Sequence, residues 1–185
     1  MATILGLSGS LRRGSFNSAL LRAAAGLMPE GSDLKIGTIE GIPLYNADLE
    51  AGGLPEAVVE LKRQIQTCDG LLLVTPEYNN SIPGVFKNAI DWASRPSSDI
   101  PAVFGGRPVA IMGASPGMFG TLLSQNAWLP VLRALGMQLW SGGRMVVPRA
   151  GAAFDDTGAL IDTGVQERLK TFLDGYVDFI EGRAR

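Results

Sequence analysis

The sequence of 185 residues contains no histidine and a single cysteine, Cys68. Histidine is the commonest general base and a frequent ligand of catalytic zinc. Its absence therefore excludes histidine-based general catalysis and a zinc site with histidine ligands. One cysteine cannot form an intrachain disulfide or a cysteine-based metal cluster, and no histidine could activate its thiol. Because Cys68 borders an apolar run, we expect a small packed side chain there, and we expect no metal site.

Long apolar runs and an excess of one charge are also missing. The sequence has no stretch of about 18 apolar residues, the length that would span a bilayer. It reaches the apolar segment Ile4–Leu7 without the features of a signal peptide. Sixteen Lys and Arg oppose eighteen Asp and Glu, which gives a formal charge of −2. This balance favours neither nucleic acid nor a strongly charged partner. We therefore expect a cytoplasmic protein that binds no membrane and no nucleic acid.

The pattern that is present is an alternation of short apolar runs with helical periods. With 46% hydrophobic and 18% charged residues, the chain is typical of one globular domain over residues 1–185. Strands are predicted at 3–7, 34–39, 71–74 and 109–112, with a fifth, whole or split, at 137–140 and 145–147. Apolar residues at three- and four-residue spacing predict helices in between. The alternation predicts an α/β fold, a three-layer doubly wound parallel five-stranded sheet.

Three loops of this fold are rich in Gly, Ser, Pro and Asn. They are the first loop (residues 8–18), the second loop (75–84) and the third loop (113–120), which follow the first, third and fourth predicted strands. In open α/β sheets, ligands bind beyond the carboxyl ends of the strands, where the strand order reverses. We therefore expect the functional site where these three loops meet.

The first loop follows a buried strand and opens a helix, so its backbone N–H groups converge at the positive end of a helix dipole. Glycines allow close turns, hydroxyls add donors and an arginine adds charge, from Gly9, Gly14, Ser10, Ser15 and Arg12. This pattern predicts a phosphate site without a metal. The loop matches neither the G-x-G-x-x-G motif nor a P-loop, which disfavours a fold that binds a dinucleotide or a nucleoside triphosphate through this loop. The alternative is an ordinary turn in which Ser15 or Asn17 caps the helix.

The second and third loops could hold a planar ligand. Prolines in the second loop fix φ and leave the intervening amides free, and Tyr78 offers a ring that could lie against a heterocycle. In the third loop, Ser115 and Gly117 could bond the edge of a ring. The alternative for both loops is plain turn chemistry.

Four segments carry a resemblance to a known family: Gly9–Asn17, Thr75–Asn79, Ser81–Gly84 and Lys87–Trp92. Together they resemble the NADPH-dependent FMN reductase family, which includes bacterial quinone, chromate and azo-dye reductases with a flavodoxin-like fold. The resemblance implies strand order 2-1-3-4-5, FMN bound without covalent attachment, and NADPH or NADH as co-substrate. Asn80 stands where many members carry an aromatic residue.

The resemblance also implies a set of cofactor-binding residues. The phosphate would be held by residues of the first loop: Ser10, Arg12, Ser15 and Asn17, with Leu11 and Phe16 of the same loop also binding the cofactor. The isoalloxazine and ribityl chain would be lined by Pro76, Glu77, Tyr78 and Asn79, and the other edge of the ring would meet Ser115 and Gly117. No catalytic residue is assigned; Tyr78 could assist, although packing against the ring is its expected role. The segment Asn88–Trp92 resembles the family's dimer-contact helix, which implies a homodimer or a homotetramer.

The function implied is that of an oxidoreductase. Hydride passes from a nicotinamide to bound FMN and then to a quinone, flavin or similar small acceptor. One alternative is a flavodoxin-type electron carrier, which the near balance of charge and the presence of Arg12 and Arg13 disfavour. The other is a flavin-binding sensor domain without turnover.

Overall fold

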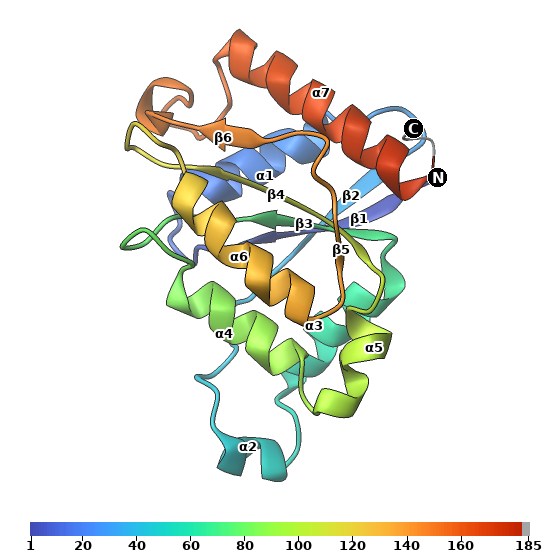
Figure 1. The fold of residues 1–185 in the computed structure, drawn as a ribbon. Coiled ribbons are helices and arrows are strands. Elements are labelled where there is room, and N and C mark those ends of the chain that lie inside the picture. Colours follow the sequence, from blue (N-terminus) through green and yellow to red (C-terminus); the bar gives the residue numbers. More distant parts are fainter. Residues whose placement is uncertain (183–185) are drawn as a thin grey trace.

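A parallel sheet forms the centre of the computed structural model, which describes residues 1–182 (Figure 1). Its strand order is β2-β1-β3-β4-β5, and β6 pairs with β4 beyond the end of β5. The order 2-1-3-4-5 is confirmed. The strands are β1 (Thr3–Ser8), β2 (Asp33–Gly37), β3 (Gly70–Val74), β4 (Pro108–Ala114), β5 (Gln138–Leu139) and β6 (Met145–Val147).

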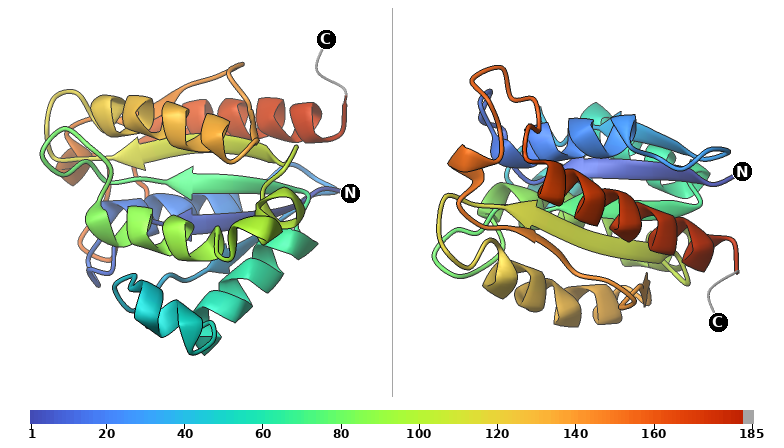
Figure 2. Two further views of the ribbon diagram at one scale, coloured as in Figure 1. Left: turned by 60° about the horizontal axis from the view of Figure 1, so that its bottom comes forward. Right: turned by 90° about the horizontal axis from the view of Figure 1, so that it is seen from above.

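Helices cover both faces of the sheet. Helices α1 and α7 lie on one face, and α3, α4 and α6 lie on the other (Figure 2). These five correspond to the helices that the apolar periodicity predicts. Two short helices, α2 and α5, escape that prediction because four or five residues offer too few turns to reveal a period. The helices are α1 (Phe16–Gly26), α2 (Ala47–Ala51), α3 (Glu56–Thr67), α4 (Gly84–Ala93), α5 (Ile100–Val103), α6 (Leu122–Ala134) and α7 (Thr163–Ile180), with 3-10 turns η1 (Ser97–Asp99) and η2 (Ala150–Ala152).

The central strand β3 shows how the sequence builds two cores. All five of its residues are buried. Leu72 and Val74 join the cluster beneath α1 and α7, whereas Leu71 and Leu73 join the cluster on the opposite face. Since successive side chains of a strand point to opposite faces, a continuous apolar run is required wherever helices cover both faces.

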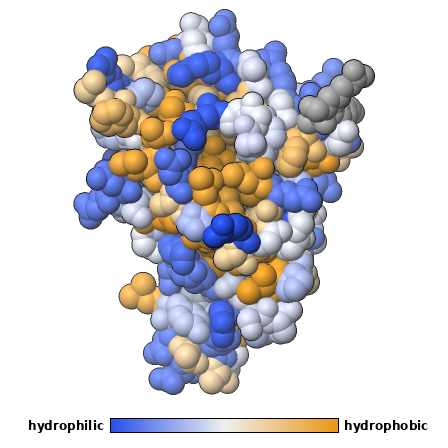
Figure 3. Space-filling view, in the orientation of Figure 1, coloured by the Kyte–Doolittle hydropathy of each residue, from blue (hydrophilic) through white to orange (hydrophobic). Residues whose placement is uncertain are grey.

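The fifth strand is split. β5 pairs with Pro108 and Val109 of β4, while β6 pairs with the last three residues of β4. Between them the chain leaves the sheet, and the ring of Trp140 packs edge-on against Phe172 of α7, with their centroids 4.9 Å apart. A cavity of about 230 Å³ lies between α6 and β5, where apolar side chains gather on the face seen in Figure 3.

Cys68 is a packed side chain at the end of α3, as expected. It is 7% exposed, and its thiol donates to the carbonyl of Ile65. Burial raises the pKa of this thiol, which keeps it in the unreactive protonated form.

The carboxyl ends of β1, β3 and β4 meet at one edge of the sheet, and the start of β1 and the end of α7 lie at the opposite edge (Figure 1). The three loops rich in glycine and serine therefore come together, as expected. No helix among residues 1–182 is long and apolar enough to cross a membrane.

Candidate functional site

The first loop is fastened to its neighbours at Gly9. The Gly9 N–H donates to the carbonyl of Val74 at the end of β3, 2.9 Å away. A Cβ at this position would lie 2.3 Å from the ring of Phe86 in α4. The glycine is thus required for packing against α4, and this contact places the loop over the sheet edge.

Ser15 is the N-cap of α1. Its Oγ accepts the N–H groups of Asn17 and Ser18, at 3.2 and 3.3 Å, and the residue is 4% exposed. A hydroxyl has one hydrogen to donate besides its two acceptor positions, and no group among residues 1–182 accepts the hydrogen of Ser15. The capping role that the sequence left open is therefore real, and it leaves a donor at the helix tip.

Further donors surround this hydroxyl. The N–H groups of Arg13, Gly14 and Phe16 find no acceptor within the described part of the chain. The guanidinium of Arg12 lies 5.9 Å from the centroid of the Phe16 ring. Free amides at the positive end of a helix, beside a hydroxyl and a cation, form an anion site.

Asn17 fixes the position of this anion site relative to β4. Its Nδ2 donates to the carbonyl of Ala114 and its Oδ1 accepts the N–H of Ala114, both at 2.9 Å. The carboxamide thus pairs with both backbone groups of the last residue of β4, as a neighbouring strand would, and it has one N–H left for a ligand. The sequence placed Asn17 in the loop, but it gave no sign of this pairing.

The second loop is a tight hairpin. Tyr78 and Ser81 exchange N–H···O bonds of 3.1 and 3.0 Å, and between them Asn79 and Asn80 have φ of 49° and 62°. Two residues at positive φ form a type I′ turn, in which asparagine is favoured. This explains Asn80. It also corrects the expectation that all the amides between the prolines are free, because the N–H of Tyr78 is bonded; those of Glu77 and Asn79 have no acceptor among residues 1–182.

Glu77 closes the start of α6. Its Oε2 accepts the N–H groups of Leu123 and Ser124, at 2.8 and 3.0 Å, while the side chain of the N-cap residue Thr121 makes no capping bond. The carboxylate neutralises the positive end of the α6 dipole. The side chain of Glu77 is therefore structural, and its backbone is what remains for a ligand.

The third loop is braced by its own hydrogen bonds. The hydroxyl of Ser115 donates to the carbonyl of Gly120, 2.7 Å away, and accepts the N–H of Gly117 at 3.2 Å. The two groups expected to meet a ring edge are thus bonded to each other. At the base of the loop, a Cβ on Gly113 would lie 2.2 Å from both the carbonyl of Thr75 and Oγ1 of Thr121, a close approach that the sequence did not reveal.

The three loops enclose a cavity of about 110 Å³. Leu11, Asn79 and Gly117 lie outside its lining, and Ala114 and Pro116 line it although they were not predicted. This volume is below the roughly 300 Å³ of small ligand pockets, so it suits a phosphate-sized group whose ligand continues over the open surface. The lining consists of Ser10, Arg12, Ser15, Phe16, Asn17, Pro76, Glu77, Tyr78, Ala114, Ser115 and Pro116.

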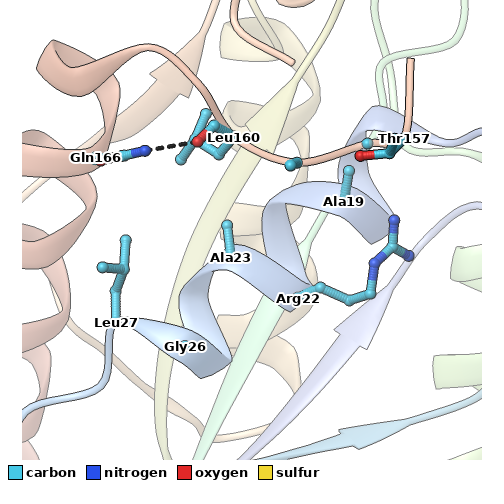
Figure 4. Close-up of a pocket in the computed structure, with 10 residues that line it drawn as sticks. Ala19, Arg22, Ala23, Gly26, Leu27, Thr157, Leu160 and Gln166 are labelled. Atoms are coloured by element: carbon cyan, nitrogen blue, oxygen red, sulfur yellow. Dashed lines mark hydrogen bonds between the residues drawn. The ribbon is translucent and has the colours of Figure 1, made fainter. Parts of the chain in front are cut away.

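A larger cavity, of about 470 Å³, lies on the outer side of α1 beneath the segment 157–160 (Figure 4). Its floor is formed by small residues of α1 such as Ala19 and Ala23, and Arg22 is the charged side chain in its lining. The amide of Gln166 is bonded to the carbonyl of Leu160, 2.6 Å away. Among residues 1–182, no cluster of free backbone amides lines this cavity as it does the smaller one, so chemistry favours the smaller cavity at the sheet edge.

Comparisons with known proteins identify the family and match the fold. The model of the family described as NADPH-dependent FMN reductase matches residues 2–152. An NAD(P)H-dependent FMN reductase of Pseudomonas aeruginosa is 46% identical over 167 residues, covering 90% of this chain and 89% of the relative. A 2-hydroxy-1,4-benzoquinone reductase of a Burkholderia species is 41% identical over 175 residues, covering 95% and 94%. The solved structure of a flavoenzyme NAD(P)H:(acceptor) oxidoreductase of Paracoccus denitrificans superposes with a TM-score of 0.88 at 34% identity, covering 100% of both chains.

Proposed function

The chain belongs to the NADPH-dependent FMN reductase family, and from this membership we propose an FMN-dependent NAD(P)H oxidoreductase that reduces quinones, free flavin or similar small acceptors. The observation that carries the proposal is the open tip of α1. There, free amides, the Ser15 hydroxyl and Arg12 converge beside two loops that can border a flat ring.

The residues present fit the phosphate of FMN. A phosphate near neutral pH carries up to two charges and accepts several hydrogen bonds. The amides of Arg13, Gly14 and Phe16 and the hydroxyl of Ser15 supply donors, and Arg12 supplies a charge-assisted contact. Ser10, Leu11 and Asn17 complete the set of loop residues that we assign to this end of the cofactor.

The second and third loops are assigned to the ring. The N–H groups of Glu77 and Asn79 are available to its polar edge, and Tyr78, 51% exposed, offers an aromatic face at the mouth of the cavity. Pro76 and Ser115 line the cavity, with Gly117 next to it. Because Ser115 is bonded within its loop, it contributes shape rather than a donor.

Bound FMN would supply the redox chemistry, accepting hydride from a nicotinamide and delivering electrons to the acceptor. The chain contributes binding, orientation and access. Hydride transfer needs no imidazole base, which is consistent with a sequence without histidine. The carboxylate of Glu77 is held by the amides of α6, so we assign no side chain as a general acid.

We further propose that residues 1–185 form one FMN-binding domain of a cytoplasmic homodimer or homotetramer. The segment Asn88–Trp92 of α4, which resembles a dimer-contact helix, is partly covered by its own chain. Asn88 Nδ2 and Trp92 Nε1 both donate to the carbonyl of Pro43, each at 2.8 Å. Val85 and Asp91, on the same helix, remain accessible for a second copy. Sedimentation of the wild type and Asp91→Arg tests this assembly, and identical profiles would exclude Asp91 from the interface.

The enzymatic proposal is tested with purified protein and no protein partner. FMN-loaded protein should oxidise NADPH or NADH in the presence of a benzoquinone, and protein stripped of flavin should regain the flavin absorption bands after incubation with FMN. An electron carrier would bind FMN but show no turnover without its partner. A protein that binds no FMN at micromolar concentration would contradict both readings.

A further inference from the structure

Backbone strain gathers at the edge of the sheet where the candidate site lies. Within residues 1–182, the non-glycine residues with positive φ are Asn79 and Asn80, in the second loop, and Arg149, which follows β6. Asparagine tolerates the left-handed region because its short side chain bonds locally. Arginine has no such side chain, so the left-handed backbone of Arg149, with φ of 49° and ψ of 44°, is less expected than that of the two asparagines. Strain of this kind clusters at functional sites.

Hydrogen bonds hold Arg149 beside the third loop. Its N–H donates to the carbonyl of Gly117, and the N–H of Ala150 donates to the carbonyl of Ser115, both at 3.0 Å. Ser115 lines the cavity of the candidate site. In Figure 1 the chain leaving β6 accordingly runs beside the loop that follows β4. The backbone of Arg149 is thus fixed one loop away from the cavity.

The guanidinium of Arg149 is exposed, and it forms no ion pair within the described residues. Arg12, which lines the cavity, and Arg13, which follows it in the first loop, are likewise exposed and form no salt bridge within the described residues. Among the acidic groups, Glu77, which lines the cavity, is bonded to amides of α6. The acidic residues nearest to Arg149 along the chain are Asp155, whose Oδ1 accepts the N–H groups of Thr157 and Ala159, and Asp156, and neither forms a salt bridge with Arg149.

We propose that Arg149 binds a phosphate of the nicotinamide dinucleotide, an inference that rests on the proposed function. The tip of α1 with Arg12 matches one phosphate, that of FMN. A dinucleotide whose nicotinamide lies on the flavin brings a pyrophosphate and, in NADPH, a 2′-phosphate, which need a cation outside that tip. The planar fork of arginine suits phosphate oxygens, and Arg149 is held where the third loop meets the solvent.

The variant Arg149→Gly tests this contact without weakening the backbone, because glycine adopts positive φ without strain. The matched control is Arg144→Ala, at the opposite end of β6, where the arginine is also exposed and forms no ion pair within the described residues. With saturating quinone, Arg149→Gly should raise the KM for the nucleotide about tenfold and leave kcat and the FMN Kd within about twofold. Arg149→Lys should recover part of the loss, and Arg144→Ala should match the wild type.

A comparison of NADPH with NADH distinguishes a contact to the pyrophosphate from a contact to the 2′-phosphate. An equal rise in KM for NADPH and NADH assigns Arg149 to the pyrophosphate, and a rise for NADPH alone assigns it to the 2′-phosphate. An unchanged KM for both, or the same rise in Arg144→Ala, would overturn the inference.

Calorimetric titration of NADP⁺ and NAD⁺ into FMN-loaded protein provides the same comparison without turnover. A Kd that rises only in Arg149→Gly supports the contact even if no acceptor is reduced, in which case the proposed function fails alone. Equal Kd values in both variants and the wild type would overturn the role of Arg149 while leaving turnover to be judged separately.

Discussion

Two helices begin at the same edge of the sheet, and their N-termini differ. The tip of α1 is open, since Ser15 caps it with a neutral hydroxyl and the amides of Arg13, Gly14 and Phe16 remain without acceptors among residues 1–182. The tip of α6 is closed, since the carboxylate of Glu77 accepts two of its N–H groups. A helix start is an anion site only while no internal carboxylate occupies it. Two loops of similar composition therefore have different roles.

Gly113→Ala should disturb the packing of β4 that positions the N-termini of α1 and α6. Its Cβ would lie 2.2 Å from the Thr75 carbonyl and from Thr121, at the start of α6, so β4 or the second loop must move. We expect the free energy of unfolding to fall by about 3 kcal/mol in urea titrations, as for an overpacked core. Gly14→Ala is the control, because the nearest atom to its Cβ would be 3.6 Å away on Arg12, and it should remain close to wild type.

Ser15→Asp should make the tip of α1 resemble that of α6. Aspartate caps a helix as well as serine does, so the fold should persist, but the fixed charge should repel the FMN phosphate. The Kd for FMN, measured by flavin fluorescence, should rise about 100-fold, since a charge-assisted contact is replaced by repulsion. Asn46→Asp, which exchanges the N-cap of the distant helix α2, should leave FMN binding unchanged. Full retention of FMN by Ser15→Asp would refute the anion site.

Glu77→Ala should open the tip of α6. Two amides would lose their acceptor, and thermal unfolding should show a loss of about 1 kcal/mol, the usual cost of removing a helix cap. Glu77→Gln keeps an oxygen acceptor without the charge and should lose less. Equal losses in the two variants would show that the charge of Glu77 is irrelevant to the capping of α6.

Arg12→Ala should weaken the open tip without closing it. The Kd for FMN should rise about tenfold, and its dependence on salt should become shallower, because one screened contact is gone. Arg22→Ala, on the outer face of α1 at the larger cavity, serves as the control and should bind FMN normally. A parallel salt dependence in Arg12→Ala and the wild type would remove Arg12 from the phosphate contact.

Much of the fold follows from local patterns. The apolar runs located the strands of the sheet, and the five long helices followed from their periodicity. Helices α2 and α5 are too short to show a period, and the division of the fifth strand into β5 and β6 was expected only as one of two outcomes. The meeting of the three loops at one edge follows from the parallel order, which a sequence with alternating strands and helices requires.

The roles of individual site residues depend on partners distant in sequence. Asn17 pairs with Ala114, 97 positions away, and Glu77 pairs with Leu123, 46 positions away. The hairpin at Asn79 and Asn80, by contrast, is local, and its two asparagines could have predicted it.

The sequence by itself determined the alternation of strands and helices, the place of the three loops and the presence of free donors at the start of α1, since these depend on residues close together in the chain. Only the tertiary structure decided which donors stay free. The tip of α6 is closed by Glu77 and Arg149 is held at the third loop, because each group takes a partner that is distant in the chain but near in space. The bond between Ser115 and Gly117, by contrast, is local. A buried or crowded polar group must be paired, and the fold chooses its partner.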